Sequence, residues 1–311
     1  YLSLFIAFII LYFKIKYFLV GGYCSVRIFE STIPKIIGVI DYYFFPLSLL
    51  VILFGEKTRK AKVAFWSLLI WSGINAFCGN RTTGMGGILI LLYIKYYCLN
   101  GKAAFSSKTS FKTQLFFITG GALMMLASSF IADYRVGRDS SDSNNGLLSF
   151  VAETGGSVTT LYTTMDVVPS SEPYQHMGYI YSAVSGFIPT FFDLTGIVTE
   201  IYEKSRYNEK WHDKYYSQFD WGFGFSLNAE AFATFGWFGF IPLFLLCLII
   251  FYFLRFNHLN YISKFDLFLS CALLFYWITL PRRDSYYVWN ALFYYVFVIK
   301  VYISLLPNKK Q

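Results

Sequence analysis

The sequence predicts an all-α fold, a polytopic bundle of transmembrane helices with one large hydrophilic segment that faces away from the cytoplasm. Of its 311 residues, 56% are hydrophobic and 14% are charged, whereas soluble domains carry about 25% charged residues. Apolar stretches near the ~20 residues that cross a bilayer recur along the chain. Lysine and arginine gather in short loops between these stretches, which is the pattern of a membrane protein.

Seven or eight spans are visible, and the chain begins with Tyr1 inside the first of them. We therefore expect preceding sequence, with further spans, to be missing from the N-terminus. The predicted spans are Tyr1–Phe13 (extending to Val20), Ile36–Phe54, Val63–Phe77, Gly87–Leu99, Gln114–Ala132, Trp237–Leu254, Phe265–Leu280 and Tyr286–Leu306.

Basic residues in the loops predict the orientation of these spans. Four clusters fall on one side, which we take as the cytoplasm: Lys57 to Lys62, Lys102 to Lys112, Arg255 with Lys264, and Lys309 with Lys310. The opposite side then holds Asn80–Gly86, residues 133–235 and Pro281–Ser285. One group of basic residues does not fit this orientation: an external loop would have a net positive charge from Lys14, Lys16, Arg27 and Lys35.

Three regions follow from this topology: N-terminal transmembrane helices at 1–132, an extracytoplasmic (periplasmic) segment at 133–235, and C-terminal transmembrane helices at 236–311. The middle region holds 13 of the 18 carboxylates and six basic residues. Within it, the more apolar stretches Leu148–Met165 and Met177–Ile201 predict short helices, which Gly155, Gly156 and Pro189 would break.

The composition also limits the kinds of binding partner that we expect. Aromatic residues make up 22% of the chain, and such rings suit a lipid-facing surface with helix ends at the headgroup level. The net charge of +8 is scattered over short loops rather than gathered on one surface, so we expect no nucleic acid. The five cysteines show no metal-ligand spacing, and no metal site is predicted.

Five arginines are predicted at the external membrane face, where the distribution of basic residues in membrane proteins leads us to expect few. The planar guanidinium binds phosphate oxygens through two parallel hydrogen bonds. We therefore favour a diphosphate-lipid site over the alternative, ion pairing with the acidic segment or with lipid headgroups. These residues are Arg81, Arg135, Arg138, Arg282 and Arg283.

Three residues are candidates for a general base. Glu153 lies among small residues in AETGGS, and Glu230 lies about one turn before an apolar run. The alternative for each carboxylate is a helix cap or an arginine partner. His176, in PYQHMGY, is the third candidate, and its alternative is an ordinary solvated histidine.

The stretch GFGFSLNAEAFATFGWFGFIPLF resembles the most specific block of Wzy-type O-antigen and capsular repeat-unit polymerases. Upstream, ETGGSVTTLY and PYQHMGYIYSAVSGFIPTFF resemble that family's acidic-Gly-Gly-Ser and Ile-Pro elements. The pair Asn80-Arg81 resembles its arginine-bearing turn. One departure is Thr190, which follows Pro189 where the family often has a basic residue.

The resemblance implies a metal-independent membrane glycosyltransferase of the GT-C type without a cofactor. It would polymerise oligosaccharide repeat units, linked to undecaprenyl diphosphate as donor and acceptor, into O-antigen, capsular polysaccharide or exopolysaccharide at the bacterial inner membrane. The lipid bilayer and a chain-length regulator are its further expected partners. In this reading the arginines stabilise the departing diphosphate, and Glu153, Glu230 or His176 deprotonates the acceptor hydroxyl. Aromatic side chains would stack on sugar rings: Tyr174, Tyr179, Tyr181, Trp211 and Trp221.

Two other functions remain open. An O-antigen ligase, which transfers the finished glycan to a lipid A core, would share the donor and the arginines. A flippase or transporter of lipid-linked oligosaccharide belongs to a different class, and the single large segment at 133–235 argues against it, because such bundles usually have short loops and paired repeats.

Overall fold

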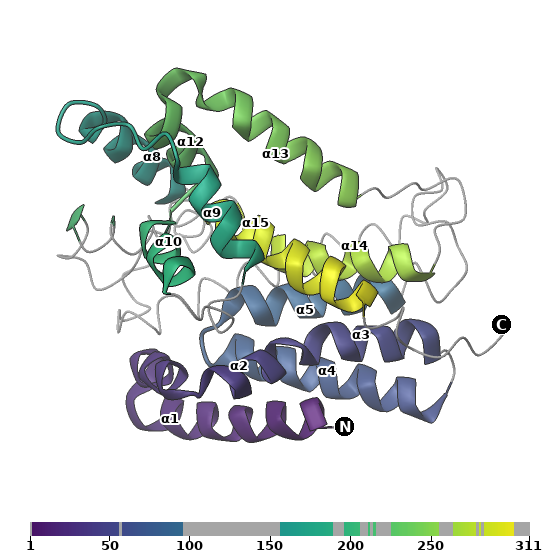
Figure 1. Ribbon diagram of the computed structural model, residues 1–311. Coiled ribbons are helices and arrows are strands. Elements are labelled where there is room, and N and C mark those ends of the chain that lie inside the picture. Colours follow the sequence, from purple (N-terminus) through teal and green to yellow (C-terminus); the bar gives the residue numbers. More distant parts are fainter. Residues whose placement is uncertain are drawn as a thin grey trace, which may run out of the picture. The chain divides into compact units, whose positions relative to one another are not determined.

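The computed structural model describes residues 2–55, 58–95, 156–188, 196–205, 211, 214–215, 225–254, 264–277, 280 and 283–301. Within these ranges every regular element is a helix (Figure 1), which confirms the predicted all-α class. The chain divides into two compact units. The first unit comprises residues 1–152 and 256–275, and the second unit comprises residues 153–255 and 276–311.

Three helices in the described part of the chain are long and apolar enough to cross a membrane: Leu2–Gly22, Ile37–Gly55 and Leu227–Phe253. Shorter apolar helices cover Thr83–Tyr93 and Phe265–Trp277. These agree with a helical membrane bundle. The predicted span Gln114–Ala132 lies outside the described residues.

In the first unit, helix α1 (Leu2–Thr32) reverses its direction at Gly21 and Gly22. Gly22 has a φ of 63°, a backbone conformation that favours glycine. The ring of Phe29 consequently returns to stack on Tyr17, with ring centroids 5.0 Å apart. Lys14 therefore lies buried between packed helices, and the prediction that it belongs to an external loop was wrong.

Four further helices complete the described N-terminal part of the first unit: α2 (Lys35–Tyr42), α3 (Phe44–Gly55), α4 (Arg59–Phe77) and α5 (Arg81–Tyr93). Aromatic contacts join them, and the ring of Phe44 on α3 lies 5.6 Å from that of Trp71 on α4. Phe45 stacks at 3.7 Å on Phe275, which belongs to α14 (Lys264–Trp277).

Helix α5 begins six residues earlier than the predicted Gly87, at Arg81. Its start is set by a cap, because the Asn80 side chain accepts a hydrogen bond from the Thr83 N–H, rather than by the onset of the apolar run. The prediction of a loop over Asn80–Gly86 was therefore wrong, because residues from Arg81 onward are helical; the external side predicted for this segment stays a prediction.

The second unit contains a membrane-length helical stretch and several shorter helices. The elements are α8 (Gly156–Val167), α9 (Gly178–Phe187), α10 (Ile197–Ser205), α12 (Leu227–Phe235), the 3-10 helix η3 (Gly236–Gly239), α13 (Phe240–Phe253), α15 (Tyr286–Ala291) and the π-helix η5 (Leu292–Val298). The short helices predicted within 148–201 are therefore present as α8, α9 and α10, and α9 ends two residues before Pro189.

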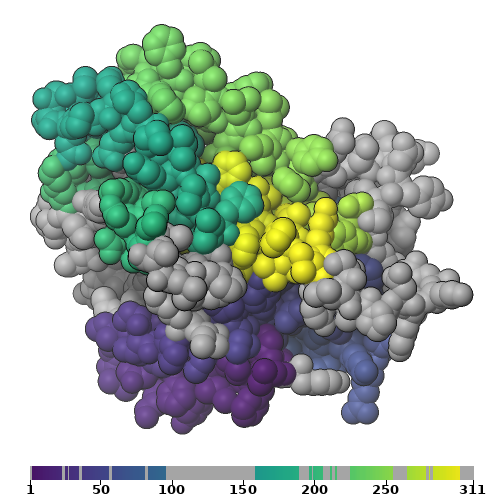
Figure 2. Space-filling model, in the orientation of Figure 1, coloured from purple at the N-terminus to yellow at the C-terminus, as the bar shows by residue number. Residues whose placement is uncertain are grey.

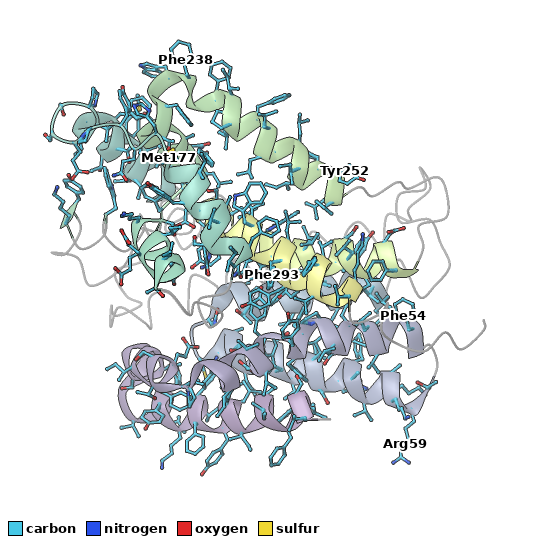
Figure 3. All side chains as sticks on the ribbon, in the orientation of Figure 1. Phe54, Arg59, Met177, Phe238, Tyr252 and Phe293 are labelled. Atoms are coloured by element: carbon cyan, nitrogen blue, oxygen red, sulfur yellow. The ribbon has the colours of Figure 1, made fainter. Side chains whose placement is uncertain are left out.

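Helix α13 presents apolar side chains on nearly all sides, as a lipid-facing helix does. Phe240 is 64% exposed and Phe251 is 71% exposed, and the side chains of Phe238 and Tyr252 project outward (Figure 3). The light-green atoms of this segment form an outer surface (Figure 2). The predicted boundary between residues 235 and 236 falls inside the apolar stretch Leu227–Phe253.

Helix α9 carries a face of small buried residues, namely Gly178, Ser182, Ser185 and Gly186. Small side chains let helices approach closely, and a Cβ added at Gly186 would lie 2.7 Å from the Cβ of Trp289. The hydroxyls of Ser185 and Ser205 are 2.9 Å apart. This face therefore brings α10 and α15 against α9.

The packing of α4 on α5 predicts opposite effects for two glycine substitutions. A Cβ at Gly84 would lie 2.4 Å from the backbone nitrogen of Ala76, whereas a Cβ at Gly73 would meet nothing within 4 Å. We expect Gly84→Ala to destabilise the protein by about 1–3 kcal/mol. Gly73→Ala, the matched control on α4, should be neutral or stabilising. Thermal unfolding in detergent measures both, and equal melting temperatures for the two variants would contradict this packing.

Candidate functional site

The carboxylate of Glu230, on α12, lies at the centre of the second unit and is completely buried. One of its oxygens accepts a hydrogen bond from the Ser285 backbone N–H at 2.6 Å. The other accepts the hydroxyls of Ser285 at 2.7 Å and Ser182 at 3.0 Å. Three hydrogen-bond donors therefore take the place of water at the two carboxyl oxygens.

These hydrogen bonds join three elements that are distant in the sequence. Ser182 lies on α9 and Ser285 precedes α15, while α12 itself starts at Ser226, whose hydroxyl accepts the Ala229 N–H at 3.1 Å. This cap fixes the first turn of α12, where Glu230 projects. We call Ser182, Glu230 and Ser285 the Glu230 cluster.

Arg283 lies two residues before Ser285 and is half-buried. Its guanidinium carbon lies 4.1 Å from the centre of the Tyr287 ring, a distance typical of a cation–π contact. Its backbone N–H donates to the Leu280 carbonyl at 3.0 Å. The Glu230 cluster thus holds the backbone beside Arg283, and Tyr287 supports its side chain.

Tyrosines and an asparagine extend from Tyr287 into the unit, a group that the sequence analysis did not single out. The ring of Tyr276 lies 5.9 Å from that of Tyr287. Its hydroxyl donates to the Asn290 side-chain oxygen at 3.1 Å, and the Asn290 amide donates to the Tyr286 hydroxyl at 3.3 Å. The tyrosine-rich run at 286–295 was the available signal, but it is also what a helix end at the membrane interface looks like.

A second polar contact ties down the segment that carries His176. Glu172 accepts hydrogen bonds from Lys214 and, at 2.7 Å, from the Tyr215 hydroxyl. Burial opposes ionisation of Glu172, but these hydrogen bonds and the Lys214 charge together hold its pKa below the usual value. A few residues on, the Gln175 N–H donates to the Ala233 carbonyl at 2.9 Å, which attaches the segment to α12.

The aromatic candidates have different environments. Tyr174 packs against Phe232, at a ring distance of 6.5 Å, and against Gly236. Trp211 is 4% exposed and belongs to the same apolar cluster, so it presents no ring for a sugar in this structure. Tyr181, on α9, is half-buried.

Among the candidate bases, His176 is exposed and Glu230 is fully buried. Arg81 is the first residue of α5. The roles predicted for these residues stay predictions. The remaining candidates lie outside the described residues: Glu153, Arg135, Arg138, Arg282 and Trp221. In the described ranges, no group of three or more His, Cys, Asp or Glu residues is arranged to hold a metal ion.

The lowered pKa of Glu172 predicts a pH dependence. A carboxyl whose pKa is lower in the folded protein stabilises the fold above its unfolded pKa, and that stability is lost as the pH falls. We expect Glu172→Gln to cost about 0.5–1 kcal/mol at neutral pH and to make the melting temperature less dependent on pH between about pH 5 and 3. Glu203→Gln, at an exposed position of α10, is the control. An unchanged acid dependence in Glu172→Gln would contradict the assignment.

Comparison with known proteins places the chain in a family. The family model described as O-antigen polysaccharide polymerase Wzy matches residues 1–310, nearly the whole chain. No curated protein and no solved structure matches the chain. Proteins of this family are multi-pass membrane enzymes of glycosyltransferase type that act on lipid-linked oligosaccharide repeat units. The chain therefore belongs to the O-antigen polysaccharide polymerase Wzy family and polymerises repeat units into O-antigen.

Proposed function

We propose that the chain transfers a growing glycan from undecaprenyl diphosphate to a hydroxyl of the next lipid-linked repeat unit. The reaction takes place at the outer face of the bacterial inner membrane, where the segment 133–235 is periplasmic, and it needs no metal. The family match over residues 1–310 carries this proposal. The buried anchoring of the backbone beside Arg283 supports the arginine role within it.

The chemistry requires a base and a cation. The acceptor hydroxyl gives up its proton to the base, and its oxygen forms a new bond to the anomeric carbon of the donor. The bond from that carbon to the diphosphate oxygen breaks, and undecaprenyl diphosphate leaves with the electron pair. Negative charge develops on the leaving diphosphate, so positioned guanidinium groups accelerate this step.

Arg283 is suited to this role by its anchoring. Its backbone is held through Ser285 and its side chain rests on Tyr287, so little order is lost when it binds a phosphate. Arg81 has a different advantage, because it begins α5 and the positive end of a helix dipole favours anions. Arg135, Arg138 and Arg282 complete the proposed set on sequence grounds.

Glu230 acts in this proposal as a positioning residue. Both of its oxygens are engaged and its side chain is buried. To serve as a base, it would have to give up hydrogen bonds that hold Ser285. The base is then His176, which is exposed, or Glu153. Tyr174, Tyr181 and Trp221 remain the proposed sugar contacts.

Removal of Arg283 tests the diphosphate role. We expect Arg283→Ala to reduce polymer synthesis about 100-fold or more, the size of effect seen when one charge-stabilising donor is lost. Arg283→Lys should retain part of the activity, because it keeps the charge without the planar fork. The assay uses purified lipid-linked repeat units, with product length read as a ladder on a gel and protein level read by immunoblot of membranes.

Arg59→Ala is the matched control, since Arg59 is exposed at the start of α4 (Figure 3). A full-length ladder from Arg283→Ala would refute its role. Transfer to a lipid A core acceptor, with repeat units left unextended, would instead favour the ligase.

Two substitutions of Glu230 separate a positioning role from a base role. In Glu230→Gln, the serine hydroxyls can rotate to accept from the new amide while its oxygen still accepts the Ser285 N–H. We expect this variant to stay within about tenfold of wild-type activity, because the geometry of the hydrogen-bond network is preserved. Glu230→Leu leaves the Ser285 N–H unpaired, at a cost of about 1–3 kcal/mol, and should lose both activity and thermal stability.

The two substitutions are assayed with the same lipid-linked repeat units. If Glu230→Gln is folded but as inactive as Glu230→Leu, then Glu230 is the base.

A further inference from the structure

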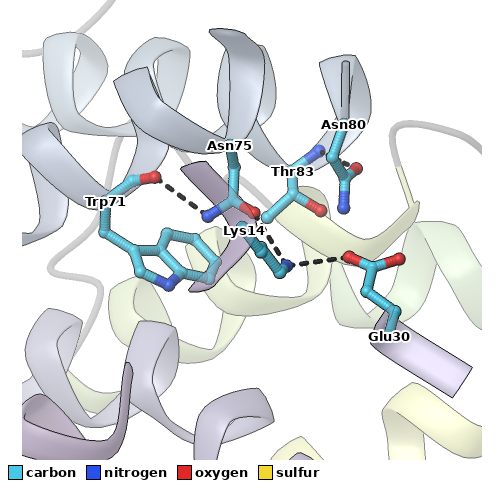
Figure 4. Close-up of polar contacts among 6 residues, drawn as sticks. All are labelled: Lys14, Glu30, Trp71, Asn75, Asn80 and Thr83. Carbon is cyan, nitrogen blue, oxygen red and sulfur yellow. Dashed lines mark hydrogen bonds and ion pairs between the residues drawn. The ribbon is translucent and has the colours of Figure 1, made fainter. Parts of the chain in front are cut away.

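The first unit contains a buried lysine, Lys14, which is 6% exposed and lies in the membrane-length helix Leu2–Gly22. A charged side chain at this depth is costly unless it is paired. Its ammonium group lies 2.8 Å from a Glu30 carboxylate oxygen and donates to the Asn75 side-chain oxygen at 3.1 Å (Figure 4). Lys14 therefore joins both arms of α1 to α4. The carboxyl group of Asp41, on α2, lies close enough to Lys14 to interact with it electrostatically.

Asn75 extends this hydrogen-bonded network toward the end of α4. It is 1% exposed, and its amide nitrogen donates to the Trp71 carbonyl at 2.9 Å. Its backbone carbonyl accepts the Asn80 N–H at 2.8 Å, beyond the end of α4. The side chain of Asn75 is thus fixed by Lys14 on one side and by its own helix on the other, while its backbone holds the next turn.

That turn ends at Arg81. Gly79 adopts a φ of 87°, which glycine accepts without strain, and the Asn80 side chain then caps α5 through the Thr83 N–H at 3.4 Å (Figure 4). The Gly84 N–H donates to the Asn80 carbonyl at 3.0 Å. Arg81, the first residue of α5, follows directly from a backbone that is hydrogen-bonded on both sides.

We propose that the buried Lys14–Glu30 pair, acting through Asn75 and the Gly79–Asn80 turn, positions Arg81 to bind the diphosphate of the lipid-linked substrate. This inference rests on the diphosphate role of Arg81 in the proposed function. A buried ion pair is not needed to hold helices together, because well-packed apolar side chains stabilise such packing at least as well. The network leads to the turn that presents Arg81, and this is what gives Lys14 a role beyond packing.

Binding of undecaprenyl diphosphate to the full chain in lipid nanodiscs tests the proposal. We expect Lys14→Met to weaken binding about tenfold, a coupling of ordinary size for residues in one network. Lys16→Met is the matched control, since Lys16 lies on the same helix and is exposed; it should bind like wild type. Because Lys14→Met alone removes the ammonium group beside the Glu30 carboxylate and can impair folding, the paired variant Lys14→Met/Glu30→Leu removes both members of the ion pair together and should show the same loss of affinity.

Double-substitution cycles distinguish positioning from a general structural effect. In an Arg81→Ala background, Lys14→Met should weaken binding no further, because the residue that it positions is absent. In an Arg283→Ala background, it should still weaken binding markedly, because Arg81 is still present for Lys14 to position.

Each other result overturns a specific claim. If Lys14→Met and the paired variant bind normally, or if the Lys14 effect is equally large without Arg81, the positioning role is refuted and the proposed function stands. If Arg81→Ala itself binds undecaprenyl diphosphate as tightly as wild type, the diphosphate role of Arg81 fails, and the inference fails with it.

Discussion

A polar or ionisable side chain buried among apolar helices must be hydrogen-bonded or paired with an opposite charge, because neither lipid nor apolar side chains can solvate it. Glu230 meets this constraint with two hydroxyls and one backbone N–H. Lys14 meets it with a carboxylate and an amide oxygen. In each unit, these hydrogen bonds and ion pairs hold together the helices that supply the partners.

The partners of Glu230 come from α9 and from the residue that precedes α15. Its hydrogen bonds therefore fix the rotation of these helices, which van der Waals packing alone would leave loosely defined. The small residues of α9 supply the remaining condition, since Gly186 lets α15 approach within contact of the backbone. A polar residue thus specifies the position of Ser285, and small residues allow that position to be reached.

The same principle links structure to chemistry. Glycosyl transfer from a lipid diphosphate requires cations that are already in place when charge develops on the leaving group. A flexible arginine at a membrane surface would lose much of its benefit in the entropy of ordering. Arg283 lies two residues before Ser285, whose backbone is held from within the unit, and Arg81 follows the cap residue Asn80. In the proposed mechanism, buried polar residues that never touch the substrate make the two arginines effective.

The sequence was most informative where a long apolar run decides the outcome. The span predicted at Ile36–Phe54 agrees within one residue with the helix Ile37–Gly55, because the bilayer thickness fixes the length of such a run. The arginine-bearing turn after α4 was recognised, but its length was wrong. Hydropathy cannot detect a cap such as Asn80, which starts α5 ahead of the apolar residues.

By itself the sequence determined the membrane class, the all-α fold and the family, because composition, apolar run length and local motifs are properties of the chain alone. Tertiary structure decided the environments of the charged residues. Lys14 looked like a residue of an external loop until the reversal at Gly22 brought Glu30 beside it. Glu230 looked like a candidate base until Ser182 and Ser285, 48 and 55 residues away in the sequence, were seen to occupy both of its oxygens. Whether a carboxyl group reaches solvent or a buried hydroxyl depends on which distant helices pack against it. The spacing of residues along the chain does not reveal which helices those are.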